Sequence, residues 1–311
     1  MYPDGRRFRS YSSYFKSLFG QRLQKVTINA GFTCPNRDGK VGTGGCTYCN
    51  NEAFSPSYCM RGGDVKTQIL QGMEFHEARY RRADNFLAYF QSFSNTYAPL
   101  DKLKEIYNSA LSLPRVKGII VGTRPDCVDE QKLDYFASLA EKYYVAIEYG
   151  IESCYDKTLR TINRGHDFEC AKRAVKMTAE RGIHTGAHFI LGLPGESEKM
   201  LLEQCDMINS LPLESIKFHQ LQIFKDTQME RDYLENPDFF HFWGVEQYIE
   251  LFSEILISLR DDIIVERFAS EAPPRFLVSP SWGKIRNDEL WRMLEKKLEK
   301  DNLCQGMLYK K

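Results

Sequence analysis

The sequence predicts an α/β protein whose parallel strands curl toward a TIM-type barrel. Short apolar segments of strand length alternate with helical segments six times between residues 23 and 224. This alternation is typical of parallel sheets built from βαβ units. Because the crossovers of such units are right-handed, successive units close toward a barrel. No low-complexity linker interrupts the pattern.

The predicted strands are short, and several are apolar along their whole length, as expected where both faces of a strand are buried. They are expected at 23–30, 86–93, 116–122, 144–150, 183–191 and 216–224. Helices are expected between them at 64–82, 100–113, 129–142, 167–181 and 197–210. Asp64 is a suitable N-cap for the first of these helices, and Gly182 follows the end of the fourth.

The last part of the chain follows a less regular pattern. It contains an amphipathic helix at 245–260, a short strand at 263–268 and a charged helix at 287–300. We interpret these elements as an extension packed on the open side of the barrel. The predicted division is therefore a barrel at 1–225 and a C-terminal extension at 226–311.

Composition limits the class of protein. A chain of 311 residues with 42% apolar residues can form one large barrel. No stretch approaches the length of a transmembrane helix, and the first twenty residues lack the apolar core of a signal peptide. With nine cysteines, an odd number, this points to a cytoplasmic protein without membrane contact.

The net charge of the chain hides a local asymmetry in how the charges are distributed. The formal net charge is +0, which argues against a strongly basic nucleic-acid binder. Asp4 is nevertheless the sole acidic residue among the first 25, which hold Arg6, Arg7, Arg9, Lys16, Arg22 and Lys25. Such a basic arm either contacts phosphates or is simply a solvated face.

Three cysteines follow the first predicted strand. Cys34, Cys46 and Cys49 have the spacing C-x11-C-x2-C in a segment, 29–54, with five glycines. Thiolates that converge in such a loop form a disulfide or hold zinc or an iron–sulfur cluster. Structural zinc takes four ligands, and Cys59 is available as the fourth. Three thiolates with one open corner suit a [4Fe–4S] cluster, with Tyr48 shielding it from water.

Polar residues collect where the predicted strands end, which is where parallel barrels bind ligands. An arginine such as Arg164 binds a carboxylate through two hydrogen bonds. A carboxylate inside an apolar run, as at Glu148, requires a partner. A glycine such as Gly192 lets backbone approach a ligand closely. The candidates are Gln91, Ser92, Glu148, Glu152, Arg164 and Gly192, and each is also compatible with a purely structural role.

Several of these segments resemble one family. The motif at 46–49 (CTYC), the stretches EYGIES at 148–153 and NRGH at 163–166, and the turn GLPGE at 192–196 are similar to radical S-adenosylmethionine (radical SAM) enzymes. The commonest spacing in that superfamily is C-x3-C-x2-C. The longer first gap resembles the YhcC/YtqA-type branch, related to the Elp3 and coproporphyrinogen-dehydrogenase-like groups.

The resemblance implies an incomplete (β/α)6 barrel and a [4Fe–4S] cluster on Cys34, Cys46 and Cys49. It implies that S-adenosylmethionine (SAM), held by the six polar candidates, is cleaved to a 5′-deoxyadenosyl radical. An electron donor such as flavodoxin or ferredoxin is then expected. The same resemblance favours a tRNA substrate, modified on the side group of its wobble uridine. A small metabolite such as a porphyrinogen, or a zinc-stabilised binding protein without catalysis, are the alternatives.

Overall fold

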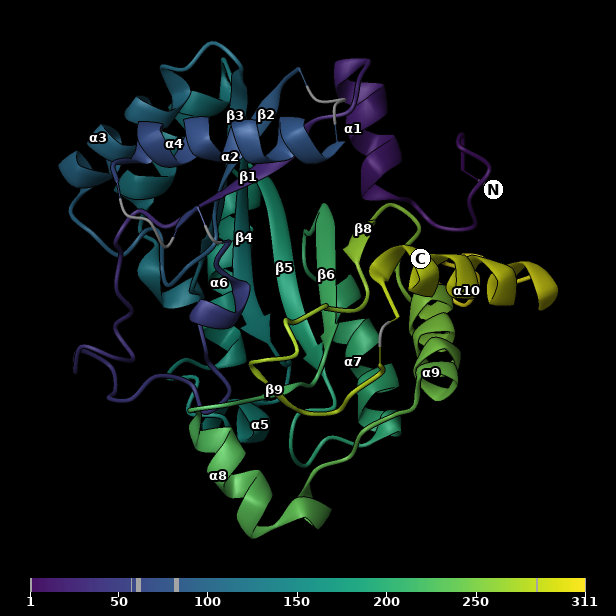
Figure 1. Cartoon of the computed structure of the whole chain (residues 1–311). Helices are drawn as coiled ribbons and strands as arrows, with labels where there is room; N and C mark the ends of the chain where they lie inside the picture. Colours follow the sequence, from purple (N-terminus) through teal and green to yellow (C-terminus); the bar gives the residue numbers. More distant parts are fainter. Residues whose placement is uncertain (1, 57, 60–62, 81–83, 284, 311) are drawn as a thin grey trace.

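Seven parallel strands form a single curled sheet, and their order in the sheet is their order along the chain (Figure 1). The structure is a computed structural model that describes residues 2–56, 58–59, 63–80, 84–283 and 285–310. The strands are β1 (Gln24–Ile28), β2 (Phe86–Phe90), β3 (Val116–Thr123), β4 (Tyr144–Glu152), β5 (His184–Leu191), β6 (Ser215–Gln220) and β8 (Ile264–Arg267). β1 and β8 are the edges, so the sheet is a partial barrel and the predicted fold class is confirmed.

Helices pack on the outer face of the sheet and bury its apolar residues (Figure 1). Every residue of β2 is buried, as predicted for a strand covered on both faces. Asp64 caps the first outer helix by accepting a hydrogen bond from the Thr67 amide at 2.8 Å. The main helices are α2 (Val65–Tyr80), α3 (Leu100–Leu111), α4 (Glu130–Ala140), α6 (Phe168–Ala179), α7 (Glu198–Asn209), α9 (Val245–Ser258) and α10 (Asn287–Lys300). The final two residues of the helix predicted at 64–82 lie outside the described residues.

The strand predicted at 216–224 is two strands. β6 ends at Gln220, and the chain leaves the sheet to form β7 (Ile223–Phe224), which pairs antiparallel with β9 (Leu277–Ser279). The edge of β6 is covered instead by β8, from the segment predicted as part of the extension. An uncovered edge exposes unpaired backbone groups, and β8 satisfies them over Ser215–Lys217. The division at residue 225 stays a prediction.

The N-terminal lead contains a helix that the sequence analysis missed. α1 (Tyr11–Phe19) begins at its N-cap Ser10, which bridges to Val265 of β8. Its Phe15 is buried inside the sheet's concave side, in a cluster with Leu87, Tyr89, Ile120 and Ala146. α1 therefore fills the barrel interior near the start of the strands. Two short helices, α5 (Asp156–Thr161) and α8 (Gln228–Glu235), were also not predicted.

Three arginines of the predicted basic arm have partners in the C-terminal part of the chain. Arg6 lies 3.3 Å from Glu295. Arg7 donates to the side chain of Asn302 at 3.1 Å and to the carbonyl of Leu303 at 3.2 Å. Arg9 donates to the Asp262 carbonyl at 2.9 Å. No helix in the described part of the chain is long and apolar enough to span a membrane.

Candidate active site

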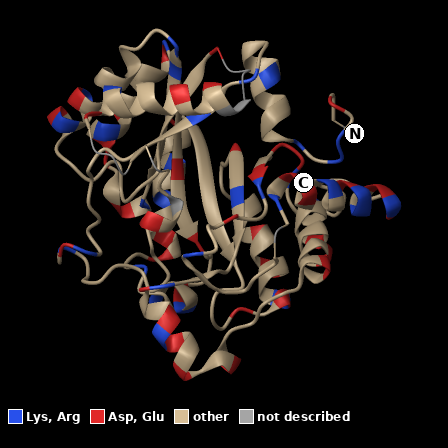
Figure 2. Ribbon diagram, in the orientation of Figure 1, with Lys and Arg blue, Asp and Glu red and all other residues tan. Residues whose placement is uncertain are grey.

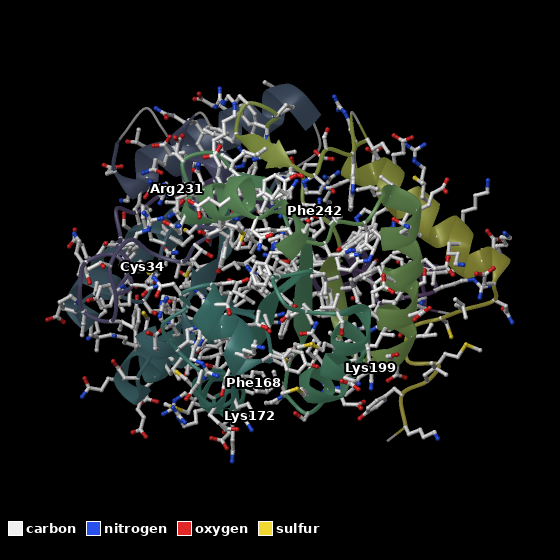
Figure 3. The ribbon with its side chains drawn as sticks, turned by 90° about the horizontal axis from the view of Figure 1, so that it is seen from below. Cys34, Phe168, Lys172, Lys199, Arg231 and Phe242 are labelled. Atoms are coloured by element: carbon white, nitrogen blue, oxygen red, sulfur yellow. The ribbon has the colours of Figure 1, made fainter. Side chains whose placement is uncertain are left out.

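A cavity of about 180 Å³ lies between the side chains at the carboxyl ends of the strands. The molecule is seen from this end in Figure 3, where Cys34 is labelled. The cavity brings together residues that are far apart in the chain, from Cys34 to His188, because all strands end at one edge. It is lined by the three loop cysteines and four of the six predicted SAM contacts: Cys34, Cys46, Cys49, Gln91, Glu148, Glu152 and Arg164.

Backbone hydrogen bonds shape the cysteine loop. The Cys34 carbonyl accepts from the amide of Arg37 at 2.8 Å, and the Cys49 amide donates to the Cys46 carbonyl at 3.0 Å. Gly45 has φ of +85°, and a Cβ on it would lie 2.9 Å from Nε of Arg37. Glycine is required there because an L side chain would be strained by the backbone and crowded by the arginine.

Three nitrogen donors point at the sulfur atoms of the loop. Arg164 Nη1 lies 3.4 Å from Cys46 Sγ, and Asn36 Nδ2 lies 3.7 Å from the same atom. Asn51 Nδ2 lies 3.7 Å from Cys49 Sγ. Hydrogen bonds to sulfur stabilise thiolates and tune iron–sulfur clusters. The donor set therefore fits a cluster held by the loop cysteines.

The three loop thiols do not converge into a metal-binding geometry. In the ranges that the structure describes, no three His, Cys, Asp or Glu side chains are close enough to hold a metal ion as they stand. Cys59, the possible fourth zinc ligand, is not among the residues lining the cavity. Its thiol donates to the Thr27 carbonyl at 3.2 Å, and burial raises its pKa to about 11. The structure thus groups three cysteines and leaves Cys59 as a protonated core residue.

Arg164 is the buried cation of the cavity. Besides Cys46, its guanidinium contacts the Gly150 carbonyl, and its Nη2 lies 3.6 Å from Oε1 of Glu152. Its Nε is buried and has no hydrogen-bond partner among the described residues. Buried polar atoms are nearly always paired, so an unsatisfied guanidinium nitrogen beside a cavity suits an anionic ligand.

Glu148 is partnered, as its apolar surroundings require, but by protein cations. It forms ion pairs with Lys217 and, at 3.5 Å, with Lys25, while His188 Nε2 lies 3.0 Å from it. Burial by itself would raise the pKa of the Glu148 carboxyl. The positive charges of Lys217 and Lys25 and the hydrogen bond from His188 together outweigh burial and hold this pKa well below its usual range. Glu148 thus forms the charged floor of the cavity.

Two of the predicted contacts do not line the cavity. Ser92 is buried, with its hydroxyl 3.4 Å from that of Ser55. Gly192 has φ of +89°, and a Cβ there would lie 2.5 Å from the indole ring of Trp243. This glycine lets the Trp243 ring pack against the backbone.

Some lining residues were missed or given little weight by the sequence analysis. Arg37 donates to the Cys49 carbonyl at 3.0 Å, and Arg124 donates to the Arg164 carbonyl at 2.8 Å. Arg124 also pairs with Asp126 through two 2.8 Å hydrogen bonds, so this pair braces the loop that holds Arg164. The signal in the sequence was the position of Asn36 and Asn51, each two residues from a loop cysteine. A side-chain amide so close to a thiolate can donate a hydrogen bond to its sulfur.

Comparison with known protein families identifies the class of enzyme to which the chain belongs. The model of the radical SAM superfamily matches residues 33–208, and that of the radical SAM C-terminal domain matches residues 213–300. The chain therefore belongs to the radical SAM superfamily, whose enzymes use a [4Fe–4S] cluster and SAM. It is 32% identical to YtqA of Bacillus subtilis, over 98% of this chain and 94% of that protein. It is 34% identical to YhcC of Escherichia coli, over 86% of this chain and 85% of that protein.

More distant matches extend the comparison. The solved structure of Methanocaldococcus infernus Elp3 with an N-terminal deletion has a TM-score of 0.70 and 16% identity, and it has the same fold over 91% of this chain and 64% of that chain. The tRNA uridine(34) acetyltransferase of the same organism is 22% identical over 61% of this chain and 34% of that protein. The coproporphyrinogen-III oxidase-like protein HemZ of Bacillus subtilis is 26% identical over 60% of this chain and 38% of that protein.

Proposed function

We propose that this radical SAM enzyme modifies the side group of the wobble uridine in a tRNA. The observation that carries the enzymatic part is the meeting of three loop cysteines with Arg164 in one cavity. The tRNA part rests on resemblance: a distant relative is named for its action on tRNA uridine(34), and the fold is that of Elp3.

The roles of the residues follow from their positions. Cys34, Cys46 and Cys49 would hold three irons of the cluster, and the Asn36 and Asn51 amides would stabilise the thiolates. Arg164, whose Nε is unpaired, would bind the SAM carboxylate, and Glu152 and Gln91, which also line the cavity, would bind the remaining polar groups of SAM. When bound, the cluster and SAM supply an organic radical that abstracts hydrogen from an unactivated C–H bond. The half-buried Tyr48 excludes water from this space. Ser92 and Gly192, which lie outside the cavity lining, support it by packing.

A wobble base is suited to a recessed cavity. Single-stranded anticodon loops present unstacked bases, whereas bases in a duplex must first be extruded. The floor of the cavity, formed by Glu148 and His188, supplies hydrogen-bonding groups for a base or its side group.

Nucleoside analysis tests the proposal directly. Total tRNA from cells with and without the gene is digested, and the nucleosides are compared by mass spectrometry. We expect one modified uridine to disappear and its precursor to accumulate, and the parent gene, but not a Cys46→Ala copy, to restore it. Identical nucleoside profiles in both strains would contradict a tRNA substrate.

A small metabolite is the second candidate. It is favoured by the pairing of Arg6, Arg7 and Arg9 within the chain, which leaves fewer cations of the predicted basic arm for phosphates, and by the likeness to HemZ. Under this alternative the tRNA nucleosides are unchanged, and a small precursor such as a porphyrinogen accumulates in the deletion strain.

A zinc-stabilised binding protein would be colourless after anaerobic purification, whereas a cluster protein is brown.

A further inference from the structure

A second and larger cavity, of about 1140 Å³, lies in the gap between the two edges of the sheet. Its walls come from the N-terminal lead, α1 and the start of β1 on one side and from β8 and α10 on the other. These elements lie together on one side of the molecule in Figure 1. Because the barrel is open between β1 and β8, this cavity reaches the charged side chains of the barrel interior, among them Lys25 and Glu266.

The lining of this gap cavity carries more positive than negative charge. Its carboxylates are all paired: Asp4 and Glu295 with Arg6, Asp288 with Arg292, and Glu266 with Lys25. Three further cations line the cavity, and the structure records no hydrogen bond or ion pair for their side chains among the residues it describes. They are Lys16, Arg22 and Arg267. Unbalanced cations around a concave surface attract polyanions and concentrate them there.

Arg267 is the innermost of the three. It is half-buried at the end of β8, in register with Lys217 of β6. Burial, and next to it the positive charge of Arg267, lowers the pKa of the neighbouring His219 well below its usual value, which keeps that imidazole neutral. A guanidinium has five donors and no acceptor. Without a carboxylate of its own, Arg267 is suited to hold an anion from outside the chain.

One layer of side chains separates the two cavities. Lys25 lines the gap cavity, Glu148 lines the cysteine cavity, and Lys25 Nζ lies 3.5 Å from Glu148 Oε1. An anion on Arg267 would therefore lie on the outer side of this ion pair. A polymer anchored there would pass beside the wall of the reaction cavity.

We propose that the gap cavity binds backbone phosphates of the substrate nucleic acid, one on Arg267 as the anchor and the next ones on Lys16 and Arg22 at the rim. This inference rests on the proposed tRNA substrate. It assigns the phosphate contacts to cations that have no partner in the fold, in place of Arg6, Arg7 and Arg9. The contact positions the RNA and does not read its sequence.

Binding titrations at several salt concentrations test this site. The variant Lys16→Ala/Arg22→Ala/Arg267→Gln removes three positive charges. We expect weaker tRNA binding and a salt dependence that is shallower by about 0.7 per lost contact, hence by about 2 in total. The matched control Arg173→Ala/Lys176→Ala/Lys199→Ala removes three charges from α6 and α7 on the outer face and should bind tRNA as the parent does.

Two readouts separate this proposal from its premise. Iron content and SAM cleavage without substrate should be unchanged in both variants, because none of these residues lines the cysteine cavity. Equal loss of tRNA binding in the two triple variants, or no loss in either, would overturn the phosphate site. If the parent binds no tRNA, the proposed substrate fails. Pyrophosphate is then the probe: stabilisation of the parent but not of the gap variant in thermal melting keeps the cavity as a phosphate site for a small substrate, and no stabilisation of the parent overturns it.

Discussion

At the scale of single residues, chemistry depends on which polar atoms the fold leaves unsatisfied. Arg164 and Glu148 are both buried charges that line the cysteine cavity, and the sequence analysis named both as SAM contacts. The fold gives Glu148 two lysines and a histidine, whereas it leaves Arg164 Nε without a partner among the described residues. The charge of Glu148 is thus balanced within the chain, whereas Arg164 keeps one donor for a ligand.

The three loop cysteines should act as one unit. Replacing Cys34, Cys46 or Cys49 singly with Ala should remove most of the iron and all SAM cleavage, because a thiolate ligand is lost. Cys59→Ala is the matched control and should keep the iron content of the parent, since its thiol bonds a backbone carbonyl. Iron and zinc analysis after anaerobic purification decides, and equal loss of the bound metal in all four variants would favour a four-cysteine site such as that of zinc.

Arg164 should bind SAM through its geometry as well as its charge. Arg164→Lys keeps the charge but loses the planar fork, so SAM affinity should fall by roughly 1–3 kcal/mol. Titration with SAM of reconstituted protein measures this effect. Because Arg164 also contacts the Gly150 carbonyl, a thermal melt must accompany the titration. Undiminished affinity in a folded Arg164→Lys protein would return this arginine to a bracing role.

Glu196 should make stability depend on pH. Burial raises the pKa of its carboxyl to about 7, although it accepts a hydrogen bond from Ser153. A raised pKa means that the folded state binds the proton more tightly, so this contribution is present below the unfolded pKa and is lost as the pH rises toward 7. At about 1.4 kcal/mol per pKa unit, Glu196→Gln should gain up to about 3 kcal/mol relative to the parent between pH 4 and pH 8. Urea titrations across that range measure the difference, and a constant difference would refute the shift.

At the scale of elements, the barrel interior is filled by a helix from outside the βα pattern. α1 places Phe15 against Leu87, Tyr89, Ile120 and Ala146, so the first strands have an apolar core on their inner face as well as under the outer helices. β7 and β9 pair with each other outside the main sheet, so the chain beyond β6 lies over the carboxyl ends of the strands (Figure 1). α1 thus fills the barrel near the start of the strands, and the β7–β9 pair covers the opposite end.

Phe15 should therefore be essential for stability. It is 4% exposed, and Phe15→Ala should lower the free energy of unfolding by about 3–5 kcal/mol, through lost burial and the cavity left behind. Leu18→Ala on the same helix is the control, because Leu18 is 51% exposed and its truncation should change stability by less than about 0.5 kcal/mol. Chemical denaturation measures both, and similar small effects would mean that α1 does not fill the interior in solution.

At the scale of the whole molecule, a buried ionic network joins both edges of the sheet through its middle. Most strand ribbon is uncharged, and the charges lie mainly on the outer helices (Figure 2). Among the exceptions are Lys25 on β1, Glu148 on β4, Lys217 on β6 and Glu266 on β8, which contact one another. Because Lys25 of the first strand pairs with Glu266 of the last at 2.7 Å, this network crosses the gap that backbone hydrogen bonds leave open.

Removing one member of the network should be strongly destabilising. Lys217→Met leaves Glu148 and Glu266 buried with too little positive charge, and we expect a loss of about 3–5 kcal/mol at pH 7. The double variant Lys217→Met/Glu148→Gln should recover part of that loss. Lys297→Met, which breaks the surface pairs of α10, should change stability by less than about 1 kcal/mol. If the loss in Lys217→Met were as small as the loss in Lys297→Met, the buried network would not stabilise the fold.

The first six strands of the barrel, the main outer helices and the three cysteines of the loop could be predicted from local patterns in the sequence. The last helix, α10, lies at 287–300 as predicted. The pairing of the charges, and the place of β8 in the sheet, depend on the folded chain. Arg7 and Asn302, or Lys25 and Glu266, are 295 and 241 residues apart, and no local pattern indicates such pairs. Charge pairing depends on contacts between distant segments, whereas strand and helix formation depends on neighbours along the chain. That Arg164 Nε and the Arg267 side chain lack a partner among the described residues could therefore be seen only in the folded chain.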